Sequence, residues 1–180
     1  LFSDCAVSDV AKNLINIFLN TRSAGRLKRI EGIEPARIKT VAMLGGGVMG
    51  SGIVHLLLQA GFHAILWDIH EAAIEKALKA IRKTFEYPIK KKKMTQADLE
   101  GMISDRLSTT CSLEDMKDVD LVIEAVLEDM EIKQDIWKRM DEICPPHAVF
   151  GTNTSALPIT NMAEALKDPG RLIGLHFFNP

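Results

Sequence analysis

The sequence predicts an α/β fold in which helices cover both faces of a mostly parallel sheet. From residue 38 onward, short apolar runs alternate with segments whose apolar residues recur at helical spacing. The apolar runs are continuous and do not alternate with polar residues, which is typical of strands buried on both faces. We therefore expect a doubly wound sheet, preceded by a short N-terminal linker helix.

The composition is that of an ordinary globular protein. The 180 residues are 47% hydrophobic and 26% charged, enough for one domain or slightly more. A balance of 22 Lys and Arg against 24 Asp and Glu argues against a general nucleic-acid binder. The three cysteines, Cys5, Cys111 and Cys144, are widely spaced, which suits a reducing compartment and gives neither a disulfide framework nor a metal site.

Two features of the chain bear on membranes and on length. Residues 41–67 carry no formal charge, but glycines and polar side chains interrupt them, so we expect a strand, a turn and a helix there and no membrane span. The chain begins with Leu1 and shows no cleavage signature. We therefore expect it to be a piece of a longer protein.

The N-terminal part predicts a linker. Residues 4–20 have apolar side chains at helical spacing, and the helix is expected to stop within residues 21–25. The polar, basic segment 26–37 contains Pro35 and favours a connection. The predicted organisation is a linker helix with its connecting segment over residues 1–37, and one domain over 38–180.

The first half of this domain predicts two strand–helix pairs. The apolar runs 41–44 and 64–67 predict strands, and residues 48–60 predict the helix between them. A second helix follows with Ile74, Leu78, Ile81 and Phe85 on one face. Pro88 is expected to end that helix.

The second half continues the alternation. Residues 95–98 resemble a capping box that opens a helix over 96–105. Further strands are expected over 107–110, 121–126 and 148–152, and 171–178 is a candidate sixth strand. Between the fourth and fifth strands lies a helical pattern made by Ile132, Ile136, Met140 and Ile143.

The glycine-rich segment between the first strand and the first helix carries the first functional signal. It fits the pattern G-x-G-x-x-G and reads Gly45, Gly46, Gly47, Val48, Met49, Gly50. Gly45 allows a tight turn, Gly47 lets backbone N–H groups approach a diphosphate, and Gly50 lets the helix pack closely on the strand. The N-terminus of the helix supplies donors and partial positive charge. A Rossmann-type dinucleotide site is the prediction, although FAD uses the same pattern and a turn that binds nothing is the alternative.

Asp68 ends the second strand and selects among dinucleotides. Its carboxylate can accept hydrogen bonds from the ribose hydroxyls of adenosine. It would repel a 2′-phosphate, and the next two residues, Ile69 and His70, offer no arginine to receive one. The sequence therefore predicts NAD as the cofactor in preference to NADP.

Two short segments near the C-terminus carry further candidates. Asn153-Thr154-Ser155 follows a predicted strand, and His176-Phe177-Phe178-Asn179-Pro180 closes the chain. By residue type alone, Ser155 fits a turn former and His176 a packed histidine. The other four histidines (His55, His63, His70 and His147) share no ligand spacing and are interpreted as structural or solvent-facing.

These segments, together with Gly45–Gly50, Asp68 and the run Glu124-Ala125-Val126 followed by Glu128, resemble the NAD-binding domain of the L-3-hydroxyacyl-CoA dehydrogenases of fatty-acid β-oxidation. The resemblance covers about residues 38–180. Residues 11–20 resemble the linker helix that joins an enoyl-CoA hydratase domain to the dehydrogenase in multifunctional β-oxidation enzymes.

The resemblance implies a role for each matched residue. His176 is implied as the general base for the 3-hydroxyl, a task that suits an imidazole, and Ser155 as a hydrogen-bond partner of the substrate beside the nicotinamide, with Asn153 in the same turn. Glu128 and Lys133 are implied to contact the cofactor. Thr84 and Lys91 are implied to contact coenzyme A.

The four lysines at 90–93 also have a rationale of their own. Clustered ammonium groups can hold the phosphates of coenzyme A, although a solvated helix end explains them equally well. In the resembled family a glutamate beyond the histidine orients it, and a helical C-terminal domain closes the cleft and forms the dimer. We therefore expect this chain to bind NAD but to turn over acyl substrate poorly.

Other interpretations remain open at this stage. A dehydrogenase of the same fold for 3-hydroxybutyryl-CoA or another 3-hydroxy acid fits the motifs, and a non-catalytic NAD-binding module would need neither Ser155 nor His176. A Ser155–His176 hydrolase lacks a G-x-S-x-G segment. The bacterial cytoplasm and the mitochondrial or peroxisomal matrix all suit the sequence.

Overall fold

The computed structural model describes residues 5, 7–24 and 32–178, and the chain divides into two compact units, residues 1–36 and 37–180. In the first unit, helix α2 (Asp9–Ala24) begins later and ends later than the predicted helix over 4–20. The connecting segment is described from residue 32 and has no helix or strand up to residue 39. The assignment of 1–37 as a linker remains a prediction.

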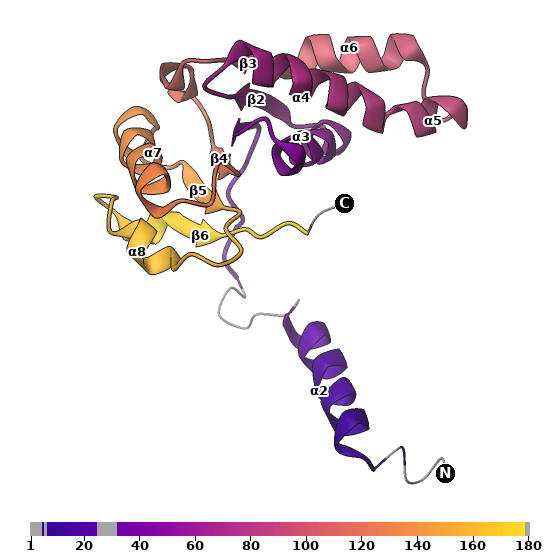
Figure 1. Ribbon diagram of the computed structural model, residues 1–180, viewed down its shortest axis with the longest axis vertical. Helices are drawn as coiled ribbons and strands as arrows, with labels where there is room; N and C mark the ends of the chain where they lie inside the picture. Colours follow the sequence, from indigo (N-terminus) through magenta and orange to yellow (C-terminus); the bar gives the residue numbers. More distant parts are fainter. Residues whose placement is uncertain (1–4, 6, 25–31, 179–180) are drawn as a thin grey trace. The chain divides into compact units, whose positions relative to one another are not determined.

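The second unit is built on six parallel strands (Figure 1). The strands are β1 (Thr40–Leu44), β2 (His63–Trp67), β3 (Leu107–Thr110), β4 (Leu121–Glu124), β5 (Val149–Thr152) and β6 (Leu172–Gly174). Their order is β3-β2-β1-β4-β5-β6, and every neighbouring pair runs parallel. This is the order of a doubly wound dinucleotide-binding sheet, so the predicted fold class is confirmed.

Helices cover both faces of this sheet. They are α3 (Val48–Ala60), α4 (Glu71–Thr84), α5 (Glu86–Lys90), α6 (Gln96–Arg106), α7 (Met130–Ile143) and α8 (Ile159–Ala163), with the short 3-10 helices η2 (Leu113–Met116) and η3 (Pro169–Arg171). None of the helices in the described part of the chain has the length and apolar character needed to cross a membrane.

Successive residues of β1 point into two different cores. Val41 and Met43 pack with side chains of α3, α4 and α6. Ala42 and Leu44 pack with side chains of η2, α7 and α8. All four are fully buried, which explains why the strand appears in the sequence as an uninterrupted apolar run.

Several element boundaries differ from the predictions. The prediction that Pro88 ends the second helix is wrong: α4 ends at Thr84, and Pro88 lies in the first turn of α5, where its missing N–H has no intrahelical acceptor. The capping box at Thr95 and Asp98 is present. The short helix α8 and both 3-10 helices had no counterpart among the predicted elements.

The last strands are shorter than predicted because their partners end. β4 stops at Glu124, since β1 turns away at Gly45 after Leu44 accepts the N–H of Ala125. β6 stops at Gly174, and the N–H of Leu175 makes the last bond to Thr152. The candidate strand over 171–178 is therefore largely irregular backbone, and His176 lies beyond the strand.

Candidate functional site

The glycine turn lies at the carboxyl end of β1, where the strand order reverses between β1 and β4. Gly45 has a φ of 103°, a conformation that side chains disfavour. A Cβ at Gly45 would lie 2.6 Å from the carbonyl oxygen of Ala125, and one at Gly50 would lie 1.8 Å from the carbonyl oxygen of Gly45. The first and last glycines of the motif are therefore required by packing.

Gly47 differs from these two glycines because a Cβ there would meet no atom within 4 Å. It is the N-cap of α3, and no side chain caps this end of the helix. The first N–H groups of a helix have no acceptor within the helix. The turn thus presents bare backbone donors beside open space, which fits a diphosphate.

Asp68 closes one side of this turn. Its Oδ2 accepts a 2.8 Å hydrogen bond from the N–H of Gly46, which ties the end of β2 to the glycine turn. Asp68 also lines a cavity of about 400 Å³ together with Gly45 and Gly47. The cavity is otherwise walled by apolar side chains that the sequence analysis did not single out as site residues: Trp67, Ile69, Ala125, Val126, Leu127, Ile132 and Ile136.

A second cavity, of about 200 Å³, adjoins the first. It contains five of the predicted site residues, Met49, Glu128, Lys133, Asn153 and Ser155, and shares Ala125 and Val126 with the first cavity. Ala125 and Val126 therefore border both an apolar half-site with one carboxylate and a polar half-site. Adenosine fits the first half-site and a nicotinamide riboside the second, so the residues present fit a dinucleotide.

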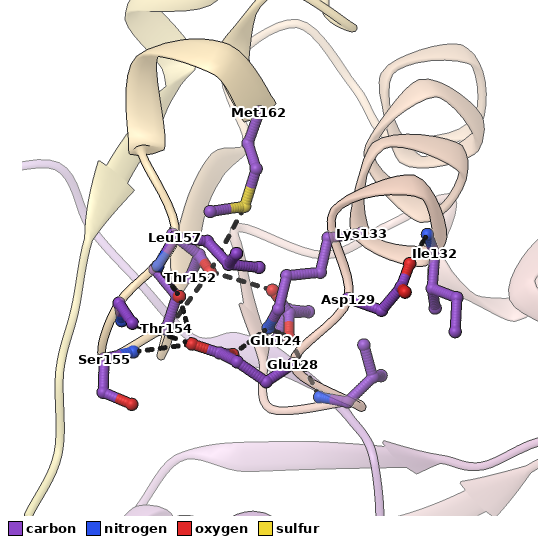
Figure 2. A network of polar contacts seen from close by, with 12 residues as sticks. Glu124, Glu128, Asp129, Ile132, Lys133, Thr152, Thr154, Ser155, Leu157 and Met162 are labelled. Atoms are coloured by element: carbon purple, nitrogen blue, oxygen red, sulfur yellow. Dashed lines mark hydrogen bonds and ion pairs between the residues drawn. The ribbon is translucent and has the colours of Figure 1, made fainter.

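Lys133 reaches the second cavity as part of a buried ion pair (Figure 2). Its Nζ lies 2.5 Å from Oε1 of Glu124, and the two side chains are 1% and 0% exposed. Glu124 also accepts hydrogen bonds from the N–H of Val126 and the hydroxyl of Thr152, each at 2.9 Å. Sequence reasoning used Glu124 only as part of a motif and gave it no role.

Glu128 joins Lys133 to the turn that contains Ser155. Its Oε2 lies 3.2 Å from Nζ of Lys133, and its Oε1 accepts hydrogen bonds from the Thr154 hydroxyl at 2.5 Å and from the Ser155 N–H at 3.0 Å. Partial burial raises the pKa of Glu128, but the bonds from Thr154, Lys133 and Ser155 outweigh it, so the pKa lies below its ordinary value. Glu128 therefore remains a carboxylate that holds this turn.

Asn153 connects the same turn to the C-terminal segment. Its side-chain oxygen accepts a 2.6 Å hydrogen bond from the N–H of Phe177. His176, next to Phe177, is exposed, and its ring lies 5.1 Å from that of Phe178. The structure thus links the two segments that the sequence singled out, although His176 is not among the residues that line the cavity of Ser155.

Thr84 lines a third cavity of about 260 Å³, formed by residues of α3 together with Phe177 and Phe178. Its hydroxyl lies 2.7 Å from Nδ1 of His55 and 2.6 Å from the carbonyl oxygen of Ile81. Met49 lines both this cavity and that of Ser155. His55, which we interpreted as structural or solvent-facing, is therefore part of a candidate site.

Lys91 does not line the cavity of Thr84. Its ammonium lies 5.7 Å from the ring centroid of Tyr87, an exposed side chain. The contact of Lys91 with coenzyme A therefore stays a prediction. Within the described residues, no three His, Cys, Asp or Glu side chains are grouped so that they could hold a metal ion.

The chain is similar to proteins of known families. Residues 40–180 match the family described as 3-hydroxyacyl-CoA dehydrogenase, NAD binding domain. The chain is 38% identical over 175 residues to the glyoxysomal fatty acid beta-oxidation multifunctional protein MFP-a of Cucumis sativus, covering 96% of this chain and 24% of that protein. It is 40% identical over 143 residues to a probable 3-hydroxybutyryl-CoA dehydrogenase of Bacillus subtilis, covering 79% of this chain and 50% of that protein.

A solved structure shows the same fold. The 3-hydroxybutyryl-CoA dehydrogenase of Escherichia coli superimposes with a TM-score of 0.76 at 35% identity, over 81% of this chain and 30% of that one. The chain thus spans about a quarter to a half of the length of the curated relatives it matches.

Proposed function

The chain belongs to the 3-hydroxyacyl-CoA dehydrogenases, of which it is the NAD-binding domain, and we propose that it serves in the oxidation of L-3-hydroxyacyl-CoA to 3-oxoacyl-CoA in fatty-acid β-oxidation. The observation that carries this proposal is the pair of cavities that share Ala125 and Val126, one with the glycine turn and Asp68 and one with Ser155. The multifunctional relative in Cucumis sativus is named for fatty acid beta-oxidation, which supports a fatty acyl-CoA as the substrate class.

The chain's own residues divide the work of binding. The turn Gly45–Gly47 and the N-terminus of α3 would hold the diphosphate, and the carboxylate of Asp68 would accept hydrogen bonds from the adenosine ribose. The polar cavity with Lys133 and Asn153 would hold the nicotinamide riboside. When bound, NAD⁺ supplies the acceptor for the hydride that leaves C3 of the substrate.

His176 and Ser155 would act on the substrate. Ser155 would donate a hydrogen bond to the oxygen on C3, and the imidazole of His176 would take the proton of the 3-hydroxyl as the hydride leaves. Thr84, in the third cavity, would contact the coenzyme A part, with Lys91 nearby along the chain. Met49 lies between the two cavities, so a thioester arm bound at Thr84 has a short path to Ser155.

The 180-residue chain and the whole protein should differ in activity. The chain alone should bind NADH through the residues named above. Within the described residues no carboxylate pairs with His176, so the chain alone should turn over acyl substrate very poorly. An enoyl-CoA hydratase domain before α2 and oligomerisation through a helical domain after the sheet are the arrangement we propose for the whole protein.

The similarity to 3-hydroxybutyryl-CoA dehydrogenases favours a second candidate. Two of these relatives match at 40% and 35% identity, so a short-chain 3-hydroxyacyl-CoA is an alternative substrate. Rates with hydroxybutyryl-CoA and with hydroxydecanoyl-CoA would separate the two possibilities in the whole protein.

The proposed function is tested in two steps. Calorimetry of the 180-residue chain should show NADH binding, and acetoacetyl-CoA should change the fluorescence of the bound NADH. In the whole protein, His176→Gln should abolish oxidation, whereas His147→Gln should leave it unchanged, because His147 pairs with Asp120 at the opposite end of β4. Absence of NADH binding, or full activity of His176→Gln, would refute the proposal.

A further inference from the structure

Glu124 has no role in the functions proposed above, yet it lies at the centre of the buried network (Figure 2). It is the last residue of β4 and is completely buried. Taking a carboxylate and an ammonium out of water carries a large desolvation cost. Such a pair is retained only where good geometry and further hydrogen bonds compensate, and here Val126 and Thr152 supply those bonds.

The donors of Lys133 show how Glu124 could act on a ligand. An ammonium group has three N–H donors. Among the described residues, Nζ donates a hydrogen bond to Oε1 of Glu124 at 2.5 Å and forms an ion pair with Oε2 of Glu128 at 3.2 Å. At least one donor is left for a ligand, and Lys133 lines the cavity that also contains Asn153 and Ser155.

The two carboxylates hold Lys133 differently. Glu124 makes the shorter contact and is fixed by backbone and side-chain donors within the sheet. The side chain of Glu128 is 41% exposed, and its Oε1 is used by the turn around Ser155. Glu124 is therefore the rigid partner that sets where the ammonium lies.

We propose that Glu124 is a positioning residue for the cofactor: acting through Lys133, it determines how tightly the nicotinamide riboside half of NAD is bound. This inference rests on the proposed function, because it takes the cavity of Lys133 as the nicotinamide half-site. Glu124 does not need to contact the cofactor directly. The adenosine half-site, with Asp68, is the adjoining cavity that shares Ala125 and Val126.

A purely structural role for Glu124 predicts a different result. Glu124 connects β4, β5 and α7 through Thr152 and Lys133, so its loss could simply loosen the sheet. Loosening would weaken both halves of the cofactor site together. A positioning role would weaken only the nicotinamide half.

The test compares two ligands on the 180-residue chain. NADH contains both halves, whereas ADP lacks the whole nicotinamide riboside. Isothermal titration calorimetry of both ligands gives a ratio of affinities for the wild type, Glu124→Gln, Lys133→Met and the double variant. Asp141→Asn is the matched control, because Asp141 forms a largely buried ion pair with Arg171 and lines neither half-site.

We expect Glu124→Gln to weaken NADH binding about tenfold or more, since a hydrogen bond from a charged donor contributes about that much. The affinity for ADP should stay nearly unchanged. Because Glu124 acts through Lys133, the double variant should show the same ratio as either single variant. Asp141→Asn should lower the melting temperature and keep the wild-type ratio.

Other results would overturn the inference. An unchanged ratio of the NADH and ADP affinities, whether or not both fall together, or additive effects in the double variant would each show that Glu124 does not act through Lys133. If Glu124→Gln fails to fold, Glu124→Asp keeps the charge that pairs with Lys133 but withdraws the carboxylate by one methylene group, and it decides by whether the ratio falls or stays at the wild-type value. A wild-type chain that binds neither ligand would instead refute the proposed function.

Discussion

The side-chain oxygen of Asn153 accepts a 2.6 Å hydrogen bond from the backbone N–H of Phe177. The two residues follow neighbouring parallel strands, β5 and β6, whose carboxyl ends lie at the same edge of the sheet. The backbone ladder between these strands ends with the bond from Leu175 to Thr152, and Asn153 extends the connection by one side chain. The turn of Ser155 and the segment of His176 are thereby held to each other.

The hydrogen bond between Asn153 and Phe177 can be tested with variants that remove or keep the acceptor oxygen of residue 153. Asn153→Ala should cost about 1 kcal/mol of unfolding free energy, the usual value of one hydrogen bond, and should speed hydrogen exchange of the Phe177 amide. Asn153→Asp keeps an acceptor oxygen and should retain most of the protection. Urea unfolding and amide exchange measured by NMR would check both; equal exchange in Asn153→Ala and wild type would show that this bond is not formed in solution.

The sequence was sufficient for the parts of the fold that depend on continuous apolar runs and on helical spacing. Val41–Leu44 shows why: each residue of this strand faces one of two cores, so no polar residue can occur within it. Boundaries set by partner strands were harder to predict. β6 ends at Gly174 because β5 has ended, and no local signal in residues 175–178 indicates this.

The site was predicted less completely than the fold. The glycine motif and Asp68 lie close together in the chain and follow a spacing rule, so sequence reasoning reached them. Glu124 and Lys133 are brought together by the return of the chain from β4 into α7, and a lone Glu at the end of an apolar strand gives no sign of its partner. The same holds for His55, which meets Thr84 only because α3 packs against α4.

Alanine substitutions at two glycines of the motif should affect stability and NADH affinity differently. Gly47→Ala places a methyl group in open space, so the melting temperature should change little while NADH affinity falls, because the methyl occupies the approach of the diphosphate. Gly50→Ala drives a methyl group into the carbonyl of Gly45 and should destabilise the fold by about 1–3 kcal/mol or more. Thermal unfolding and calorimetry distinguish the two; unchanged NADH affinity in Gly47→Ala would argue against diphosphate binding at this turn.

Asp68→Asn should reduce the preference for NADH over NADPH. The amide loses the negative charge that repels a 2′-phosphate, yet its oxygen can still accept the bond from the N–H of Gly46. The expected result is weaker NADH binding and a smaller ratio between the two affinities. Calorimetry with both cofactors measures this ratio, and a variant with the wild-type ratio would show that another residue selects the cofactor.

Glu128 should be needed for the turn around Ser155. Glu128→Leu removes the acceptor of the Thr154 hydroxyl and of the Ser155 and Ala156 N–H groups. We expect hydrogen exchange of these two amides to quicken about tenfold, a change equivalent to about 1.4 kcal/mol. Glu128→Gln keeps an acceptor oxygen and is the control; slow exchange in Glu128→Leu would mean that the turn is held by other contacts.

His55 should give the stability of the chain a dependence on pH. Burial lowers the pKa of His55 below its ordinary value, so the neutral form is favoured in the folded state. As the pH falls, the unfolded chain takes up the proton first, near its ordinary pKa of about 6.5. The stability that neutral His55 contributes is therefore fully present above that pH and is lost as the pH falls through the lower pKa of the folded state.

Burial beside an aromatic ring favours the neutral form of His55, whereas the contact with Thr84 suits both protonation states. The Thr84 hydroxyl has one hydrogen, which the carbonyl of Ile81 accepts at 2.6 Å, so the contact at 2.7 Å is a hydrogen bond when Nδ1 of His55 carries the donor hydrogen. The ring also lies 4.3 Å from that of Phe85, which is fully buried. A charged imidazolium in these surroundings would lose part of its hydration.

The measurement is urea unfolding of the wild type and of His55→Gln at several pH values between 8 and 5. Glutamine can donate a hydrogen bond to Thr84 but does not titrate, so the variant should lose less stability below about pH 6.5 than the wild type does. His63→Gln replaces an exposed histidine at the start of β2 and should keep the wild-type dependence. If His55→Gln follows the wild-type curve across this range, the loss of stability comes from another group, and His55 is not held in its neutral form by the fold.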